Sequence, residues 1–272
     1  MKNRLPDIPR NRICAVVPAA GRGTRLGVQT PKVFVPIFPS ITIWDVIHDK
    51  LSQLVDHTVL VLSQDGQDYL KKNHANFNPE SFDKTEIGLQ STPLGMGDAI
   101  FCVSDLWSKY ENILIVWGDQ FNLSLHTLQT CLDLHSTQGT TSLTLPVVRT
   151  PSPYVEYIFD SSGSLTKVRQ TREGDQCEPN GFSDIGVFLL SGGSTLCEEW
   201  HRYRTTSASG SATGEINFLP FLAYLSSIAK WPVARYETKD PTEAVGINTP
   251  DDLAFARQLL QKNLPTTKKS YG

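Results

Sequence analysis

The feature that most constrains this chain is a glycine-containing loop directly after a short apolar run. Residues 13–17 are apolar and mostly β-branched, so they predict a buried strand. The loop 18–27 follows, and its glycines let backbone N–H groups close around an anion. This pattern predicts an α/β fold in which the first strand delivers a phosphate-binding loop to the edge of a sheet.

Two cations follow the glycines. Arg25 offers a planar, always-charged fork, and Lys32, after Pro31, offers a mobile point charge. No Lys-Ser/Thr pair follows the glycines, which excludes a Walker loop, and Leu26 replaces the third glycine of a dinucleotide fingerprint. For the loop alone, a glycine-rich turn with two solvated cations is the alternative interpretation.

Composition limits the class of protein less sharply than the glycine loop does. The 272 residues carry 25 basic and 28 acidic side chains, a formal charge of −3, so no broad cationic face is expected for nucleic acid or anionic lipid. The five cysteines show no C-x-x-C spacing and indicate reduced thiols in a cytoplasmic protein. We expect neither a membrane segment nor a signal peptide.

The alternation of segments predicts a Rossmann-like α/β fold, with a mixed, mostly parallel sheet and helices on both faces. A hairpin at 154–159 and 164–169 begins a small β-rich lobe at roughly 149–190. We expect one domain over 13–262, a flexible N-terminus at 1–12 and a flexible tail at 263–272. The expected strands are 58–62, 113–117 and 140–148, and the expected helices are 43–54, 97–107 and 123–135.

Five segments, in order, resemble the motifs of the sugar-1-phosphate nucleotidyltransferases. The resemblance is nearest to the uridylyltransferase part of the N-acetylglucosamine-1-phosphate uridylyltransferases and covers about 13–260. No hexapeptide repeats are present, so acetyl transfer is not expected. The five segments are 19–26 with Pro31-Lys32, 90–99, 117–120, 214–217 and 246–253.

The resemblance implies a role for each motif. Arg25 would bind the departing phosphates and Lys32 the charge that develops around the α-phosphate, both as catalytic groups. Gln90 would read the base. The implied nucleotide-binding residues are Ala19, Ala20, Gly21, Arg22, Gly23, Thr24, Gln90, Gly95 and Gly118.

Asp119 is the predicted metal ligand. It follows the apolar run 113–117, so its carboxylate is expected at the carboxyl edge of the sheet, and Mg²⁺ prefers hard oxygen ligands. The alternative is a turn aspartate that caps the helix starting near Ser124. Asn248 is the second Mg²⁺ ligand implied by the resemblance, although with Thr249 and Pro250 it also fits the start of a helix.

The base-reading segment departs from the family pattern. The Gln90 amide can both donate to and accept from uracil, and Gly95 would let the backbone approach the ring. Met96 and Asp98 replace the threonine and histidine typical of this segment, so the preferred base stays open. A surface glutamine is the alternative for Gln90.

The implied sugar-binding residues are Tyr154, Gln170, Asp184 and Glu215. Gln170 replaces a glutamate and Asp184 an asparagine, so the sugar need not be N-acetylglucosamine. Arg172, near Gln170, could bind an anionic group or be a solvated charge. Glu215 could also be a first-turn carboxylate of a helix.

The expected activity is the Mg²⁺-assisted transfer of a nucleotidyl group, with UTP favoured, to a sugar 1-phosphate. The expected partners are those two substrates, with neither nucleic acid nor membrane, and the oligomeric state stays open. One alternative is a CTP- or GTP-dependent transferase acting on another phosphorylated sugar or polyol. The other is a non-catalytic nucleotide-binding regulator.

Overall fold

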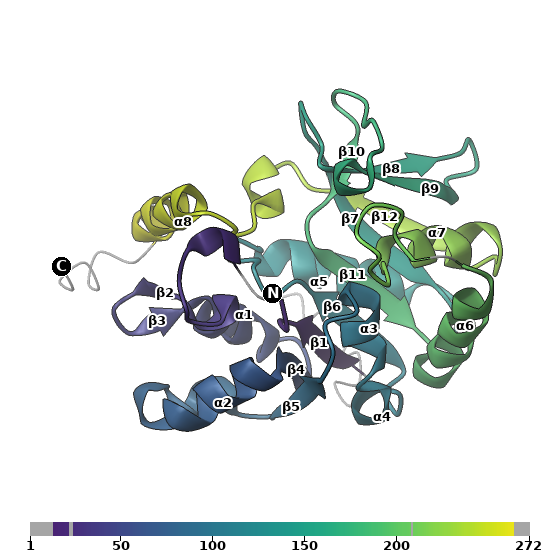
Figure 1. The fold of residues 1–272 in the computed structure, drawn as a ribbon. Coiled ribbons are helices and arrows are strands. Elements are labelled where there is room, and N and C mark those ends of the chain that lie inside the picture. The colour runs from purple at the N-terminus through teal and green to yellow at the C-terminus, as the bar shows by residue number, and fades with distance from the viewer. Residues whose placement is uncertain (1–12, 22–23, 208, 264–272) are drawn as a thin grey trace, which may run out of the picture.

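The computed structural model describes residues 13–21, 24–207 and 209–263. Its centre is a ten-stranded mixed sheet (Figure 1). The expected flexible N-terminus, Arg22, Gly23 and all of the expected tail except Asn263 lie outside the described residues.

The half of the sheet nearer the N-terminus is parallel. Because parallel strands point the same way, the segments that follow them meet at one edge of the sheet. The apolar, β-branched residues of β1 are buried throughout, as a strand covered on both faces requires. In spatial order these strands are β5 (Thr85–Gln90), β4 (His57–Ser63), β1 (Ile13–Pro18) and β6 (Asn112–Val116).

The other half is built around an antiparallel strand. β11 (Val187–Ser191) lies antiparallel between β6 and β7 (Leu143–Arg149), and β12 (Val233–Glu237) runs parallel to β7. β10 (Phe182–Asp184) pairs with β7 and continues the sheet into β8 (Val155–Phe159) and β9 (Leu165–Gln170), at the top of Figure 1. The predicted hairpin is therefore present as β8 and β9. A separate small sheet joins β2 (Pro36–Phe38) to β3 (Ile41–Thr42).

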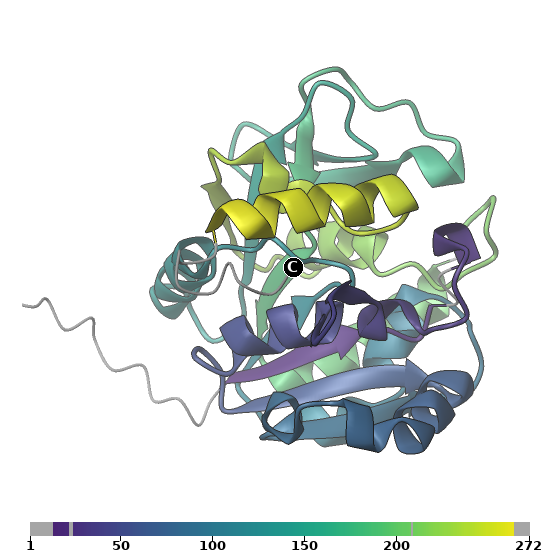
Figure 2. The same cartoon turned by 90° about the vertical axis from the view of Figure 1, so that its left-hand side faces the viewer.

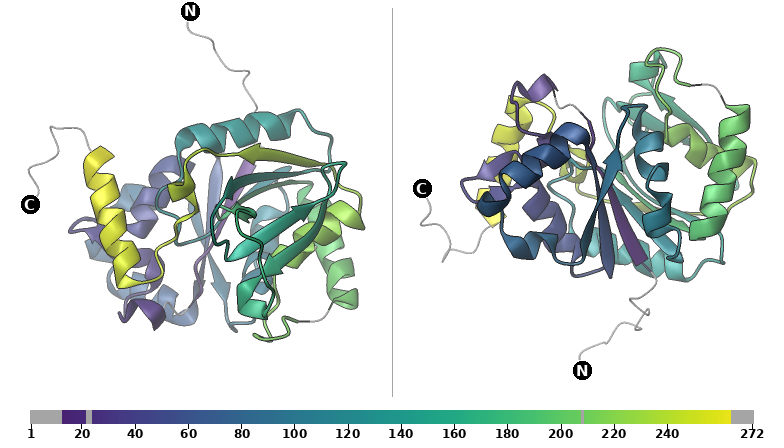
Figure 3. Two further views of the ribbon diagram at one scale, coloured as in Figure 1. Left: turned by 90° about the horizontal axis from the view of Figure 1, so that it is seen from above. Right: turned by 60° about the horizontal axis from the view of Figure 1, so that its bottom comes forward.

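Helices cover both faces of the sheet (Figure 3). One apolar cluster contains Trp44 and packs under α1 (Ile43–Leu51), α2 (Gln64–Lys72), α5 (Leu125–Ser136) and α8 (Pro250–Asn263). The opposite cluster contains Trp107 and Phe221 and packs under α3 (Met96–Phe101), α4 (Ser104–Trp107), α6 (Gly193–Thr206) and α7 (Leu219–Ser227). Figure 2 shows α8 on the same side of the sheet as α1.

Two expected helices and one possible helix start differ from the sequence-based expectation. The helix predicted over 43–54 ends at Leu51. The helix predicted over 97–107 is two helices, α3 and α4, because Val103 leaves the helical conformation at φ −114° and ψ 24°. Glu215 begins no helix, since α7 starts only at Leu219 and the backbone before it bonds to the segment that precedes α3.

Candidate active site

The phosphate-loop candidate and Asp119 follow neighbouring parallel strands. β1 ends at Pro18 and β6 at Val116, and the two strands pair directly. Gly118 lets the following segments touch, because a Cβ there would lie 2.9 Å from Ala19 Cβ and 3.1 Å from the Pro18 carbonyl oxygen. The glycine of the Gly-Asp motif therefore has a packing role.

Lys32 reaches both predicted metal ligands. Its Nζ donates to Asp119 Oδ2 at 2.7 Å and to Asn248 Oδ1 at 3.0 Å. Arg25 Nη2 donates to the same Asn248 oxygen at 3.1 Å. The structure thus brings together four predicted site residues from three distant parts of the chain, and we call Arg25, Lys32, Asp119 and Asn248 the Lys32 cluster. The interpretation of the two cations as merely solvated does not fit these contacts.

Backbone contacts hold the two ligand candidates in register. Ile247 N donates to Asp119 O at 3.0 Å, and Gln120 forms a β-bridge with Gly246. A Cβ on Gly246 would lie 3.0 Å from Asp119 Cγ, so a larger residue would push against the carboxylate. This close approach explains why the late motif has a glycine at this position.

Helix capping is carried by neighbouring residues. Ser124 Oγ accepts from Thr127 N at the start of α5, so Asp119 is not the cap of that helix. At the start of α8, Asp252 Oδ2 accepts from Thr249 N and Thr249 Oγ1 accepts from Asp252 N, a reciprocal cap. Asn248 therefore lies at the helix start, as expected, while its side-chain oxygen faces the two cations.

Asp184 ends β10 within electrostatic reach of the Lys32 cluster. Burial, together with the negative charge of Asp119, raises its pKa from 3.8 to about 6, although Gly186 N–H donates to its Oδ1 at 2.8 Å. The nearby Tyr157 hydroxyl is buried and has no hydrogen-bond partner among the described residues. Of the expected sugar-binding residues, Asp184 is thus the one linked electrostatically to Asp119.

Gln90 ends β5 at the same edge and is only 5% exposed, so the interpretation as a surface glutamine is wrong. Its Nε2 donates to Asp98 Oδ2 at 2.8 Å and to Gly95 O at 3.1 Å. Gly95 has φ +113°, and a Cβ there would lie 2.8 Å from the Ile216 backbone nitrogen. The sequence predicted Gln90 and Gly95 as site residues but gave no sign that Asp98 binds the Gln90 amide.

Glu215 lies in a loop, residues 210–217, that contacts the base-reading segment. Ile216 N donates to Leu94 O at 2.7 Å, and Gly97 N donates to Ile216 O at 2.9 Å. The Glu215 carboxylate pairs with Arg172, which follows β9, so Arg172 is not a purely solvated charge. This loop therefore bridges the base-reading segment and the strands at the top of Figure 1.

Glu173 fixes the other side of that loop. It accepts hydrogen bonds from Ala212 N, Thr213 Oγ1 and Asn217 Nδ2. Burial alone would raise the pKa of Glu173, but these hydrogen bonds outweigh it and lower the pKa to about 2. Glu173 is thus a carboxylate at neutral pH.

The remaining predicted residues are more dispersed. Ala20 is buried and Gly21 is exposed, while Thr24 begins the 3-10 helix Thr24–Leu26. Tyr154, 57% exposed, precedes β8, and Gln170, 5% exposed, ends β9. Among the described residues, no hydrogen bond or ion pair joins Tyr154 or Gln170 to the Lys32 cluster.

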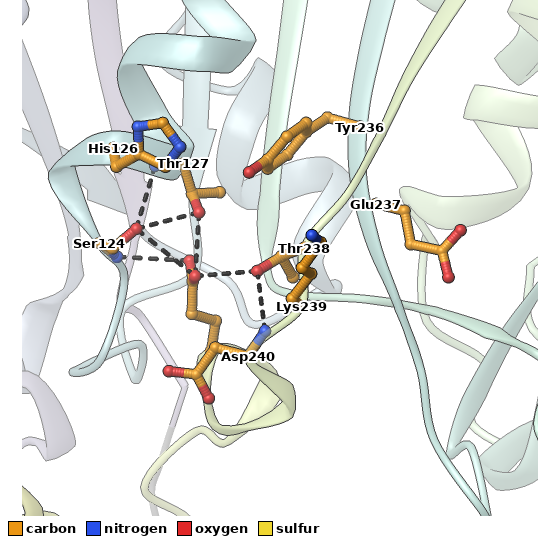
Figure 4. A pocket seen from close by; sticks show the side chains of 9 residues that line it. Ser124, His126, Thr127, Tyr236, Glu237, Thr238, Lys239 and Asp240 are labelled. Atoms are coloured by element: carbon orange, nitrogen blue, oxygen red, sulfur yellow. Dashed lines mark hydrogen bonds between the residues drawn. The ribbon is translucent and has the colours of Figure 1, made fainter.

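A cavity of about 380 Å³ lies beside α5 and β12 and contains none of the Lys32 cluster (Figure 4). On its wall Glu243, 3% exposed, accepts from Thr127 Oγ1 at 2.9 Å and Thr238 Oγ1 at 3.0 Å. These bonds tie the start of α5, which follows Asp119, to the segment before Asn248. Sequence reasoning missed Glu243, because its partner Thr127 lies 116 residues earlier in the chain and leaves no local signal.

Metal candidates are few elsewhere. Within the described ranges, no group of three or more His, Cys, Asp or Glu side chains could hold a metal ion. Asp119 and Asn248 together offer one carboxylate and one amide oxygen close to the same Lys32 nitrogen. Both are hard ligands, and Mg²⁺ in nucleotide sites takes few protein ligands besides substrate phosphates, so this pair fits such an ion.

As to membranes, no helix in the described part of the chain is both long and apolar enough to cross one.

Solved structures share this fold. One is a 4-diphosphocytidyl-2C-methyl-D-erythritol synthase from Anaerococcus prevotii, with a TM-score of 0.61 and 14% identity over 92% of this chain and 96% of that one. Another, from Bacillus anthracis, is assigned as a glucose-1-phosphate thymidylyltransferase and has a TM-score of 0.66 and 12% identity over 91% and 94% of the two chains. The chain therefore shares its fold with these two proteins, which confirms the predicted fold class.

Curated proteins that resemble this chain in sequence include several bifunctional GlmU proteins. Over 92% of its length, this chain is 23% identical to the bifunctional protein GlmU of Desulfotalea psychrophila, and the match covers 71% of that protein. Over 91% it is 27% identical to GlmU of Aquifex aeolicus, covering 53%. The chain spans about half the length of most of the GlmU proteins it matches, and no family model matches it. These relatives confirm the resemblance to the sugar-1-phosphate nucleotidyltransferases that the motifs predicted.

Proposed function

We propose that this protein joins a nucleoside triphosphate, with UTP favoured, to a sugar 1-phosphate and releases pyrophosphate. A phosphate oxygen of the sugar 1-phosphate attacks the α-phosphorus in line, and the bond from that phosphorus to the β-phosphate bridging oxygen breaks. The observation that carries this proposal is the convergence of Lys32, Asp119 and Asn248, with Arg25 on the same asparagine oxygen. No covalent enzyme intermediate is needed, since the barrier is lowered by positioning and charge stabilisation.

The residues divide the work by their chemistry. Arg25 would bind the departing phosphates with its planar fork, and Lys32 would stabilise charge on the α-phosphate. Asp119 and Asn248 would hold Mg²⁺, which when bound neutralises phosphate charge. The exposed backbone at Gly21 would approach the triphosphate directly.

The sugar pocket would favour donors on the substrate. With a pKa of about 6, Asp184 is mostly a carboxylate at neutral pH and accepts hydrogen bonds where an asparagine could also donate. On β9 the replacement is the opposite one, since Gln170 is an amide where the resemblance expects a carboxylate. The sugar phosphate would therefore present a hydroxyl or amino group to Asp184, and N-acetylglucosamine 1-phosphate need not be the substrate.

A second candidate has one observation in its favour. The Anaerococcus structure is named for a cytidyl product of a polyol, and it shares the fold over nearly the whole chain. A CTP-dependent enzyme acting on a phosphorylated polyol would use the same phosphate loop and metal pair.

Pyrophosphate release from UTP, CTP, GTP and dTTP, each with a panel of sugar 1-phosphates and polyol phosphates, tests both candidates. Mass spectrometry of the nucleotide product identifies the acceptor. Arg25→Ala and Asp119→Ala are expected to lose most turnover and to keep the wild-type circular dichroism. Wild-type-like rates in either variant would contradict the assigned roles, and no release with any pair would favour a regulator that only binds nucleotide. The cytoplasmic location belongs to the same proposal.

A further inference from the structure

We propose that Asp98 determines base selectivity by holding the Gln90 amide so that only its carbonyl oxygen is free to meet the base. This inference rests on the proposed function in one respect, since the family resemblance that supports that function also assigns Gln90 to the base. It concerns a residue with no role in the expected site, and it assigns Asp98 as a positioning residue.

Both amide hydrogens of Gln90 are already used. Nε2 donates to Asp98 Oδ2 at 2.8 Å and to Gly95 O at 3.1 Å. A flipped amide would place Oε1 against a carboxylate and a carbonyl, where it would meet two acceptors and no donor. The Gln90 side chain is 5% exposed, so little water is available to relieve that mismatch.

Asp98 itself is held firmly. It lies in the first turn of α3, which begins after Gly95, and Ala99 N donates to Gly95 O at 3.0 Å. Gly97 N is anchored on Ile216 O at 2.9 Å. The carboxylate that orients Gln90 therefore comes from a helical turn that backbone hydrogen bonds hold on both sides.

The Gln90 carbonyl oxygen determines which group of the base Gln90 can bind. Gln90 Oε1 has no hydrogen-bond partner among the described residues and can only accept. A glutamine with a free N–H could donate to uracil O4 or cytosine N3, whereas this one can only receive a hydrogen bond. It therefore reads an N–H of the base: N3–H in UTP, or the N4 amino group in CTP. A base that presents an acceptor or a methylated nitrogen at this position leaves the Gln90 oxygen without a donor, and this difference is the selectivity that we assign to the Asp98 contact.

Equilibrium binding by calorimetry tests this without requiring turnover. The readout is a selectivity ratio, the dissociation constant of the second-tightest of UTP, CTP, GTP and ATP divided by that of the tightest. Asp98→Ala should lower this ratio about five- to tenfold, the worth of one buried hydrogen bond. Asp98→Asn should keep it within about twofold, because the amide oxygen of asparagine can still accept from Nε2. Asp105→Ala, which removes an exposed carboxylate from α4, is the matched control and should leave the ratio unchanged.

A double-mutant cycle isolates the coupling. In a Gln90→Ala background, Asp98→Ala should change the ratio less than twofold, because there is no amide left to position. An equal effect in both backgrounds, or no effect of Asp98→Ala in the wild-type background, would overturn the proposal.

A second measurement does not depend on any variant folding. The wild-type protein should bind N3-methyluridine triphosphate at least about tenfold more weakly than UTP, since the methyl group removes the N–H that Gln90 accepts. Equal affinities would overturn the proposal, as would a wild-type protein that binds the four triphosphates alike. Selective binding without pyrophosphate release would instead contradict the proposed function and leave this inference standing.

Discussion

Replacing Lys32 by methionine is expected to tighten metal binding in the absence of nucleotide and to slow turnover. The Lys32 ammonium contacts both predicted metal ligands, at 2.7 Å from Asp119 Oδ2 and 3.0 Å from Asn248 Oδ1. A divalent ion bound by the same oxygens must displace or repel this ammonium. Methionine keeps much of the length of the side chain and removes the charge.

The size of the effect follows from the ion pair. At 2.7 Å the Coulomb attraction is about 6 kcal/mol at an effective dielectric constant of about 20 and about 1.5 kcal/mol in bulk water. The two side chains are 21% and 17% exposed, so desolvation offsets much of the larger figure. A net of about 1.5–3 kcal/mol, typical of hydrogen bonds to charged groups, converts to about ten- to hundredfold tighter binding.

Mn²⁺ titration followed by electron paramagnetic resonance measures this directly. Arg25→Met is the matched control, because among the described residues Arg25 bonds to Asn248 and not to Asp119, so its loss should tighten binding less. Turnover of Lys32→Met should fall about 10²- to 10³-fold despite the tighter metal, as when a transition-state donor is removed. A folded Lys32→Met protein that binds Mn²⁺ no more tightly than the wild type would refute the idea that ammonium and metal share these oxygens.

Two further predictions concern stability. Because folding raises the pKa of Asp184 from 3.8 to about 6, protonation of this carboxyl group stabilises the folded state. This contribution to the unfolding free energy is at most about 3 kcal/mol, is complete below pH 3.8 and is lost as the pH rises to about 6. Asp184→Asn should therefore gain unfolding free energy relative to the wild type between pH 4 and pH 7 in urea titrations, and a constant difference would contradict the shift. Glu243→Ala should lower the unfolding free energy by about 2–4 kcal/mol, because buried hydroxyl groups of Thr127 and Thr238 lose their acceptor. Glu243→Gln should lose less, and a change below about 0.5 kcal/mol for Glu243→Ala would show that water replaces the carboxylate.

The place of Asp119 at the sheet edge could be predicted from local rules, whereas Asn248 was expected as a ligand only from the family resemblance. Apolar strands followed by a glycine loop and by Gly118-Asp119 must meet at one edge when those strands are parallel. The helix start after Asn248 was equally visible, since Thr249, Pro250 and Asp252 form a cap signature. In both cases the residues that decide the structure are neighbours in sequence.

The rest depends on contacts between distant segments. Nothing near Val187 shows that β11 runs antiparallel between β6 and β7. Glu215 follows a glycine as helix-starting residues often do, but backbone hydrogen bonds from Ile216 to Leu94 and Gly97 hold it in a loop. The Gln90–Asp98 contact likewise depends on how α3 turns back onto β5, which spacing alone does not specify.

The loop 210–217 joins the segment proposed to read the base to the strands proposed to bind the sugar. Ile216 in this loop forms backbone hydrogen bonds with the base-reading segment. Glu173 and Arg172, which follow β9, bind the loop through hydrogen bonds and an ion pair. Because the loop is bound on both sides, we expect a displacement of the base-reading segment to be passed on to the residues proposed to bind the sugar. Substitutions at Glu173, remote from any base, should accordingly alter how the protein discriminates among nucleotides.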